Sequence, residues 1–567
     1  MIPESLQPDF IAALEAHQRG DRDHARTKLA DIIARHPDCH EAIVMHADIS
    51  AESGDLQTAE AALRRALEHA PEQPEYLQRL ARILLRQRRP IEAAEIIERL
   101  IAMRPADATL HTELANIRLF ARQFVPAEAA FRRAIDIDPA STTAGSGLIL
   151  ALAGQERNED AVAEALRFTE RCPHVAEPYA RLAILLERLD RIDEARPHAE
   201  KAVAIDPSHG LALFALGTIQ LRAGELEPAR RTLERAEAVA TDPNDRSAVA
   251  RTLGQTLDRL ARYDDAFRKF ADSKPAAETL SPAIRHMTDE LLRFIDASRR
   301  VLDPWAVASW GDAPSYKAFS TPPIFVVGFP ASGATLCQRM LAAHGSFITA
   351  DELPAMSKLR EHLQRHAPGI ENVPAYLARI GEPEIRILRA HYFNEIERLL
   401  ARQDPIGKRL VDHHSINLAH LPIVRRIFPD APVIVCIRDP RDAVLSAFMQ
   451  PARGPVAAAL LSSLPRAADY CNAIMQLWIH LREVLGLRSI EVRYENLVTN
   501  TEDEARRITT FLNETWNPDI LRKINRGQAP DDFTPQSIGR WKNYRGHFGA
   551  ALDSLNPLVK ALGYTPD

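Results

Sequence analysis

A proline returns every 34 residues through the N-terminal part of this 567-residue chain. These prolines are Pro37, Pro71, Pro105, Pro139, Pro173 and Pro207. Alanines follow the same period, at Ala25, Ala59, Ala93, Ala127, Ala161, Ala195 and Ala229. Proline ends a helix, and small side chains let two antiparallel helices pack closely. Two columns in register therefore predict helix–turn–helix units that stack on their neighbours.

The 34-residue period resembles that of tetratricopeptide (TPR) repeats. We expect residues 1–242 to form seven such repeats in an all-α right-handed solenoid, and residues 243–316 to hold a degenerate repeat or cap followed by connecting helices. The first helices of such pairs line a concave groove that can bind a peptide or protein segment. The alternative is an array that only rigidifies the chain or forms a homodimer.

Composition limits the other functions open to the chain. The formal net charge of -6 gives no electrostatic argument for binding nucleic acid. No segment approaches 18 consecutive apolar residues and the first residues do not look like a signal peptide, so we expect a cytoplasmic protein that does not bind membranes. The five cysteines lack CxxC spacing, which predicts reduced thiols and no metal site.

The pattern changes at Pro322, where apolar runs begin to alternate with helical stretches. We expect strands at residues 324–327, 431–437 and 489–493, within an α/β domain over residues 317–567. Such alternation predicts a mostly parallel sheet that binds ligands at the carboxyl ends of its strands.

The first of these strands leads into a small-residue loop and then a helix. Gly328 and Gly333 permit close approach of the backbone, while Ser332 and Thr335 offer hydroxyls beside the positive end of the helix dipole. This arrangement predicts a phosphate site, although a glycine-bearing turn without a ligand is the alternative. Ala334 stands where a Walker A loop has lysine, which argues against ATP or GTP hydrolysis and makes a nucleotide kinase a weak third possibility.

Residues 330–336 resemble the phosphosulfate loop of sulfotransferases that use phosphoadenosine phosphosulfate (PAPS). The segment RDPRDAVLS, residues 438–446, is similar to the part of that family that holds the 3′-phosphate. Residues 494–497 resemble its YE[DN]L segment, and residues 537–544 resemble the closing segment of TPR-linked bacterial sulfotransferases. The resemblance covers about residues 322–564 and implies a P-loop-like fold.

The resemblance implies that PAPS binds as co-substrate and leaves as phosphoadenosine phosphate (PAP). The residues implied for this binding are Ser332, Gly333, Ala334, Thr335, Arg438, Ser446, Tyr494 and Arg540. The spacing agrees for two of them, because Arg438 follows a strand and Ser446 lies two helical turns later, so both can reach one phosphate. The alternative is a local salt bridge from Arg438 to Asp439 or Asp442.

For catalysis, the resemblance implies Glu352 as general base, whereas a charge near a helix N-terminus is the alternative. Ala331 replaces the family's basic loop residue, and the segment Asp412–Asn417 lacks its lysine. We expect His413 or His414 to supply the missing positive charge, with Arg339, Lys358 or Arg540 as other sources.

The chain is therefore predicted to transfer a sulfuryl group from PAPS to a hydroxyl or amine of an acceptor, such as a peptide or other large substrate recruited by the TPR array. The alternative is an impaired sulfotransferase-like module that serves as a TPR scaffold, which Ala331, Ala334 and His413 favour. The acceptor, the ligand of the groove and the oligomeric state stay open.

Overall fold

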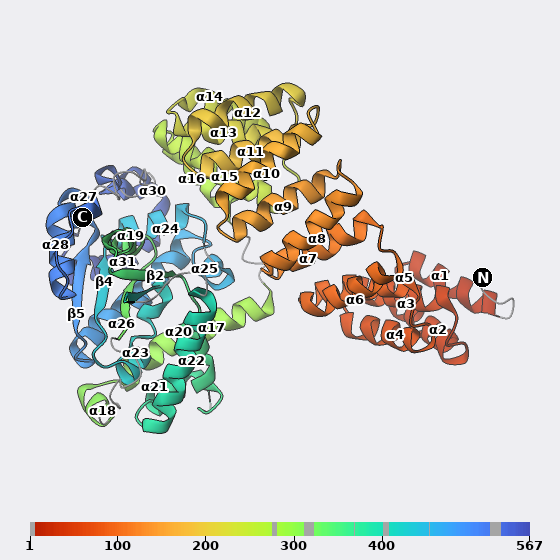
Figure 1. Cartoon of the computed structure of the whole chain (residues 1–567). Helices are drawn as coiled ribbons and strands as arrows, with labels where there is room; N and C mark the ends of the chain where they lie inside the picture. Colours follow the sequence, from red (N-terminus) through yellow and green to blue (C-terminus); the bar gives the residue numbers. More distant parts are fainter. Residues whose placement is uncertain are drawn as a thin grey trace. The chain divides into compact units, whose positions relative to one another are not determined.

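The computed structural model describes residues 6–274, 281–310, 322–367, 369–400, 407–452, 454–521 and 534–566. The chain divides into two compact units, Met1–Val239 and Ala240–Asp567 (Figure 1). The division into three domains at residues 242 and 316 stays a prediction.

The first unit consists of antiparallel helix pairs, and its helices are α1 (Gln7–Gln18), α2 (Arg22–Arg35), α3 (His40–Glu52), α4 (Leu56–His69), α5 (Pro74–Arg86), α6 (Pro90–Met103), α7 (Ala108–Phe120), α8 (Phe124–Ile137), α9 (Thr142–Gly154), α10 (Asn158–Arg171), α11 (Ala176–Arg188), α12 (Ile192–Ile205), α13 (Gly210–Arg222) and α14 (Leu226–Val239). Each even-numbered helix from α2 to α12 ends two residues before a periodic proline. Every alanine of the periodic column has an exposed fraction of 0%. The predicted all-α TPR-like solenoid is confirmed.

The turn inside each pair adds a third column that the sequence analysis missed. One residue per turn has a positive φ, and these residues are Gly20, Gly54, Arg88, Arg122, Glu156, Asp190 and Gly224. They too are 34 residues apart, because each turn needs one left-handed residue. Glycine meets this need without strain in three repeats, whereas the other side chains bear a cost of roughly 1 kcal/mol each.

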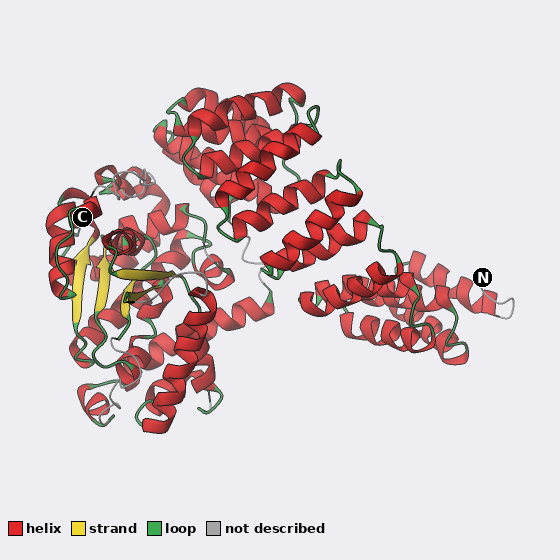
Figure 2. Ribbon diagram, in the orientation of Figure 1, coloured by secondary structure: helices red, strands yellow, loops and turns green. Residues whose placement is uncertain are grey.

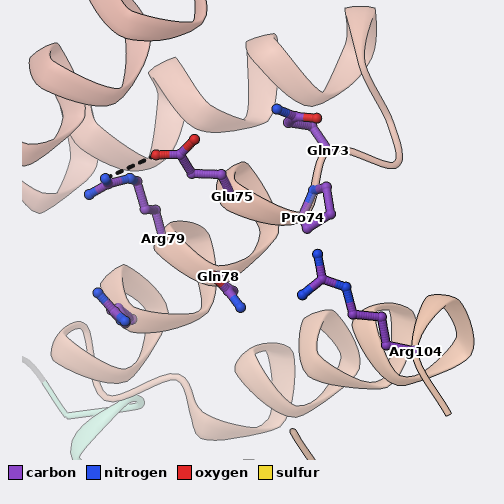
Figure 3. Close-up of a pocket in the computed structure, with 7 residues that line it drawn as sticks. Gln73, Pro74, Glu75, Gln78, Arg79 and Arg104 are labelled. Carbon is purple, nitrogen blue, oxygen red and sulfur yellow. Dashed lines mark hydrogen bonds and ion pairs between the residues drawn. The ribbon is translucent and has the colours of Figure 1, made fainter. Parts of the chain in front are cut away.

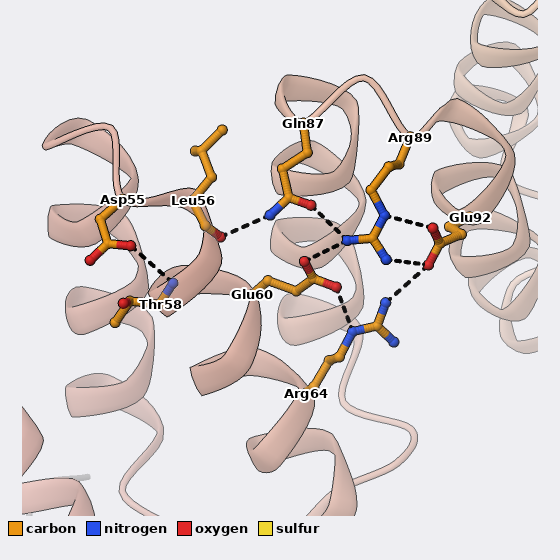
Figure 4. Close-up of polar contacts among 8 residues, drawn as sticks. All are labelled: Asp55, Leu56, Thr58, Glu60, Arg64, Gln87, Arg89 and Glu92. Carbon is orange, nitrogen blue, oxygen red and sulfur yellow. Dashed lines mark hydrogen bonds and ion pairs between the residues drawn. The ribbon is translucent and has the colours of Figure 1, made fainter. Parts of the chain in front are cut away.

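Neighbouring repeats are also joined by polar contacts at these turns (Figure 4). Arg89 donates to Glu60 in the preceding pair (Nη1–Oε2 2.6 Å) and to Glu92 in its own pair (Nε–Oε1 2.6 Å), while Gln87 donates to the carbonyl of Leu56 (3.0 Å). The side chains are partly exposed, so each pair contributes less than about 1 kcal/mol. These contacts fix the spacing of the repeats more than they stabilise them.

The second unit contains a sheet of five parallel strands (Figure 2). The strands are β1 (Ile324–Gly328), β2 (Phe347–Asp351), β3 (Arg409–His413), β4 (Val433–Ile437) and β5 (Ser489–Arg493), in the order β2-β3-β1-β4-β5. The predicted parallel sheet is confirmed, with β1, β4 and β5 at the expected places. β2 and β3 were missed because polar residues interrupt their apolar runs, as Asp412 and His413 do in β3.

Helices cover both faces of the sheet. The unit contains α15 (Pro243–Arg259), α16 (Tyr263–Asp272), α17 (Pro282–Val301), α18 (Pro304–Ala308), α19 (Ala334–His344), α20 (Ala355–Gln364), α21 (Val373–Tyr376), α22 (Glu382–Leu400), α23 (Leu421–Ile427), α24 (Pro440–Met449), α25 (Pro455–Leu460), α26 (Leu464–Val484), α27 (Tyr494–Thr499), α28 (Thr501–Phe511), α30 (Arg545–Phe548) and α31 (Ala550–Ala561), with short 3₁₀ turns that include η4 (Ser415–Leu418), η6 (Pro535–Ser537) and η7 (Arg540–Tyr544). Apolar residues of α19 and α28 pack on one face, and Phe325 on the other face meets Tyr392 of α22. No described helix meets the length and apolarity that a membrane span requires.

The strand order decides where a ligand can bind. The chain leaves β1 for β2 and β3 on one side and then crosses to β4 on the other side. In parallel sheets the carboxyl ends of the strands on the two sides of such a switch border a crevice. Gly328 at the end of β1 pairs with Cys436 of β4, so the segments that follow these two strands start side by side.

Candidate functional site

Every strand of the sheet ends at or next to a predicted site residue. Glu352 follows β2, His413 ends β3, the loop at 329–333 follows β1, Arg438 follows β4 and Tyr494 follows β5. The register places Asp351 opposite His413 and Ile437 opposite Arg493. The topology therefore gathers these segments at one edge of the sheet, although they are far apart in the sequence.

Two residues of the loop after β1 lie in the left-handed region of backbone space. Ala331 and Gly333 both have positive φ, at 62° and 98°. A Cβ added at Gly328 would lie 2.5 Å from the carbonyl oxygen of Cys436, so this position requires glycine. Gly333 is the N-cap of α19, and among the described residues no side chain caps this helix. Its first N–H groups and the positive end of its dipole are therefore available to an anion.

Arg438 touches this loop directly. Its Nη1 donates to the carbonyl of Ala331 (3.0 Å) and its Nη2 donates to the carbonyl of Ser537 (2.9 Å). The guanidinium lies over the ring of Tyr494 (4.1 Å to the centroid), and the residue is only 3% exposed. Its buried Nε has no hydrogen-bond acceptor among the described residues. A buried donor of this kind is costly unless a ligand or water satisfies it.

The predicted alternative for Arg438 was a salt bridge to Asp439 or Asp442, and neither bond forms in the described structure. Asp439 instead pairs with Arg441 (2.8 Å). Asp442 accepts the backbone N–H groups of Gly539 (2.6 Å) and Trp541 (2.9 Å). Burial raises the pKa of Asp442 to about 6, against the opposing effect of the nearby Arg438 charge.

The segment at 534–544 forms the wall behind Arg438. The hydroxyl groups of Tyr494 and Ser537 are 2.6 Å apart, and Tyr494 is fully buried. Ser446, on α24, is buried as well. A Cβ added at Gly333 would lie 3.1 Å from Cδ2 of Tyr494, so the tyrosine packs between the loop and Arg438.

Glu352 and the two histidines lie at the other side of β1. The N–H of Glu352, whose φ is 51°, donates to the carbonyl of His413 (2.7 Å). His413 is buried, and Nδ1 of His414 accepts the N–H of Ile416 (3.2 Å). This bond places the proton of a neutral His414 ring on Nε2. The helix that follows Glu352 begins at Ala355, so Glu352 is not in its first turn.

A buried polar network below β3 was missed from the sequence. Asp412 accepts hydrogen bonds from the hydroxyl of Tyr392 (2.8 Å) and from Nδ2 of Asn417 (3.0 Å). Nδ1 of His420 lies 3.3 Å from Oδ1 of Asn417. Burial raises the pKa of Asp412 to about 6 and holds the pKa of His420 well below its usual range.

Two of the other expected cations have carboxylate partners. Lys358 pairs with Glu395. Arg540, which is among the predicted PAPS-binding residues, donates to Asp258 of α15 (Nη2–Oδ2 2.6 Å). Because this pairing offsets the charge of Arg540, a direct role in donor binding has no support from the geometry. Arg339 is exposed on α19.

The described residues contain no cluster of three or more His, Cys, Asp or Glu side chains suited to a metal ion. All five cysteines are buried and unpaired with one another.

The first unit has a cationic pocket of its own, with a volume of about 470 Å³ (Figure 3). It is lined by Gln73, Pro74, Glu75, Gln78, Arg79, Arg82 and Arg104. Arg79 is neutralised by Asp48 (Nη1–Oδ1 2.6 Å) and Glu75 (3.1 Å). Arg82 and Arg104 are exposed, and neither guanidinium donates a hydrogen bond to another described residue. In Figure 3 the side chain of Arg104 points toward Pro74 and Gln78.

Comparison with known proteins distinguishes the same two parts of the chain, the helical repeats and the unit with the β-sheet. A family model described as "Sulfotransferase family" matches residues 322–518. Models described as "Tetratricopeptide repeat" match residues 12–74, 50–117 and 174–242.

Individual relatives point the same way. An uncharacterized protein of Aquifex aeolicus is 24% identical over 69% of this chain and 52% of its own length. Protein-tyrosine sulfotransferase A of Caenorhabditis elegans is 24% identical over 44% of this chain and 68% of its own length. The chain thus spans about half the length of the first relative, 52%.

Among solved structures, a tetratricopeptide repeat protein from Parabacteroides merdae ATCC 43184 matches at 16% identity and a TM-score of 0.35, over 45% of this chain and 100% of its own. The family models and the parallel sheet lead to one conclusion: the chain carries a domain of the sulfotransferase family, preceded in sequence by tetratricopeptide repeats.

Proposed function

We propose that the protein transfers a sulfuryl group from PAPS to a hydroxyl of a peptide acceptor. The observation that carries the proposal is the contact of Arg438 with the loop after β1. A buried guanidinium with an unsatisfied Nε lies against a glycine-bearing loop that opens onto an uncapped helix. Both features suit phosphate groups.

The residues present fit the two ends of the donor. The N–H groups at the start of α19, with Ser332 and Thr335, would hold the phosphosulfate. Arg438 and Ser446 would hold the 3′-phosphate, since both follow β4 and are buried, and Arg438 contacts the loop. Tyr494 would act mainly by packing under Arg438 (4.1 Å) and not by contact with the base.

The β2 and β3 side would carry the chemistry at the acceptor. Glu352 would accept the proton of the acceptor hydroxyl while the new S–O bond forms and the bond from sulfur to the phosphate oxygen breaks. His414 would donate to a phosphate oxygen that gains charge, while its Nδ1 accepts the N–H of Ile416. His413 ends the neighbouring strand but is buried.

A calorimetric titration of the full chain with PAP tests donor binding. We expect Arg438→Ala to weaken binding by about 2 kcal/mol, roughly thirtyfold, because a charge-assisted contact is lost. Arg482→Ala is the matched control, because Arg482 pairs with Glu491 at the surface (3.2 Å). Absence of heat with the unmodified chain would remove the proposal.

The pocket lined by Arg79, Arg82 and Arg104 supports an acidic peptide as acceptor. Two exposed guanidinium groups beside the amide of Gln78 form a positive site on a chain whose formal net charge is -6. The name of the Caenorhabditis elegans relative suggests tyrosine as the group that is modified. We therefore propose that this pocket recruits a glutamate-rich segment near an acceptor tyrosine.

Charge reversal tests the recruitment step. The double variant Arg82→Glu, Arg104→Glu should raise KM about tenfold for a tyrosine peptide with flanking glutamates, since attraction becomes repulsion. Its KM for a peptide with flanking serines should not change. Equal effects on both peptides would contradict a charge-specific role.

A scaffold without turnover is the second candidate, and Ala331 is the observation in its favour. The backbone at 331 is left-handed, and its side chain supplies no cation beside the loop. If the chain binds PAP but transfers no label from PAPS to any tyrosine peptide, the scaffold is the better description.

A further inference from the structure

The helix pair α15–α16 has the pattern of a TPR-like repeat, yet it belongs to the C-terminal unit. Its turn does not continue the 34-residue spacing of left-handed residues. That spacing places the next such residue at position 258, but the residue with positive φ is Ala261. The proposed function assigns it no role. The helix pair does, however, contact the segment at 534–544 that packs behind Arg438.

Asp258 of α15 makes the central contact. It accepts hydrogen bonds from the hydroxyl of Tyr544 and from Arg540 (Nη2–Oδ2 2.6 Å, Nε–Oδ1 3.3 Å). The side chains of Arg540 and Asp258 are only 14% and 12% exposed. A carboxylate held away from water by three donors of one short segment is a strong anchor, because removing it takes the carboxylate from a buried cation.

The other end of this segment reaches the predicted donor site. Arg438 donates to the carbonyl of Ser537 (2.9 Å), and Asp442 of α24 accepts the N–H groups of Gly539 and Trp541. Residues 537–544 therefore form a short bridge. Asp258 holds one end of it and Arg438 holds the other.

Helix α16 makes a second, independent contact with α24. The ring of Phe267 packs against Phe448 (centroids 5.4 Å apart) and stacks on His547 (4.1 Å). Just after α16, Nζ of Lys274 donates to the carbonyl of Gln450 (2.8 Å) at the end of α24. Because α24 also carries Ser446, the helix pair supports both predicted residues of the 3′-phosphate site.

We infer that α15–α16 is a working part of the donor site, and that Asp258 is a positioning residue that fixes the bridge at 537–544 and, through it, the guanidinium of Arg438. This inference rests on the proposed function, since it concerns the same donor. It predicts that a change in a helix distant in sequence from every strand of the sheet alters affinity for the donor.

The test compares Asp258→Asn with Asp265→Asn in the full chain. Asp265 lies on the same helix pair but bonds only to Arg262 and Arg268 in described contacts, so it controls for loss of a surface ion pair. We expect Asp258→Asn to raise the Kd for PAP about tenfold and the KM for PAPS in parallel, because the bridge and Arg438 are coupled. The acceptor KM should stay within twofold, and Asp258→Glu should restore part of the affinity.

Each outcome separates the two proposals. No binding of PAP by the unmodified chain would end the proposed function itself. Binding by the unmodified chain together with an unchanged PAP affinity in Asp258→Asn, whatever the loss in Tm, would show that the helix pair only supports the fold. If Asp258→Asn does not fold, Tyr544→Phe, which removes one of the bonds to Asp258, decides the same question by its PAP affinity.

Discussion

The repeats and the carboxyl ends of the β-strands differ in how far along the chain their contacting residues lie from one another. In the repeats, each buried alanine packs only against its own and neighbouring helices, and the same solution returns after 34 residues. At the sheet, residues from five strand ends, between Gly328 and Tyr494, converge once. A substitution in one repeat should therefore disturb mainly that repeat, whereas a substitution at one strand end should also disturb the residues that follow the other strands.

The largest expected effect is a loss of catalysis while the repeats and the sheet stay intact. Glu352→Gln should lower kcat about 10²- to 10⁴-fold, because the acceptor proton loses its base. The affinity for PAP should stay unchanged, since Glu352 lies on the β2 side and Arg438 on the β4 side of the sheet. Single-turnover rates with PAPS check this, and a rate equal to that of the unmodified chain would remove Glu352 from catalysis.

Two glycines, one in each region, test the comparison directly. Gly328→Ala forces a Cβ to within 2.5 Å of the Cys436 carbonyl in β4, so we expect PAP binding to fall at least thirtyfold, by about 2 kcal/mol or more. Gly147→Ala on α9 brings a Cβ to 2.2 Å from the ring of Phe131, which should lower stability by about 1–3 kcal/mol. Its PAP affinity should remain that of the unmodified chain. A loss of donor affinity in Gly147→Ala would show that a substitution within the repeats also disturbs the donor site.

A buried carboxyl in β3 predicts that the stability of the sheet unit depends on pH. The folded-state pKa of Asp412, about 6, lies above its unfolded value, so the folded protein binds the proton more tightly. The associated stability is present below about pH 4 and is lost as the pH rises through 6, on the order of 2–3 kcal/mol. Asp412→Asn should flatten this part of the stability profile. Denaturant titrations between pH 4 and 7 measure it, and equal slopes in both proteins would contradict the assignment.

The smallest effects concern the left-handed column of the repeats. Arg88→Gly and Glu156→Gly should each stabilise the chain by up to about 1 kcal/mol, because glycine relieves the strain at positive φ. Gly54→Ala should destabilise it by a similar amount. Thermal unfolding compares the three, and a stabilising Gly54→Ala would show that the turns relax without cost.

The amount that could be predicted differs between the two regions. In the repeats, helix ends follow from the prolines and buried positions follow from the alanines, because every interaction is local. In the sheet, β1 and β4 have continuous apolar runs and β5 alternates polar and apolar residues, and all three were predicted, while the polar ends of β2 and β3 hid those strands. The role of Arg540 could not be predicted, since its partner Asp258 is 282 residues away.

The solenoid and the loop after β1 can be read from periodicity and from short segments, and the same segments predict positions for a phosphate. Which segments meet is seen only in the folded chain: the strand order places Arg438 against Ala331, and Asp258 bonds to Arg540 and Tyr544. Hydrogen bonds between distant segments cannot be recognised from the sequence, because each forms only once and joins residues that no repeat or local pattern connects.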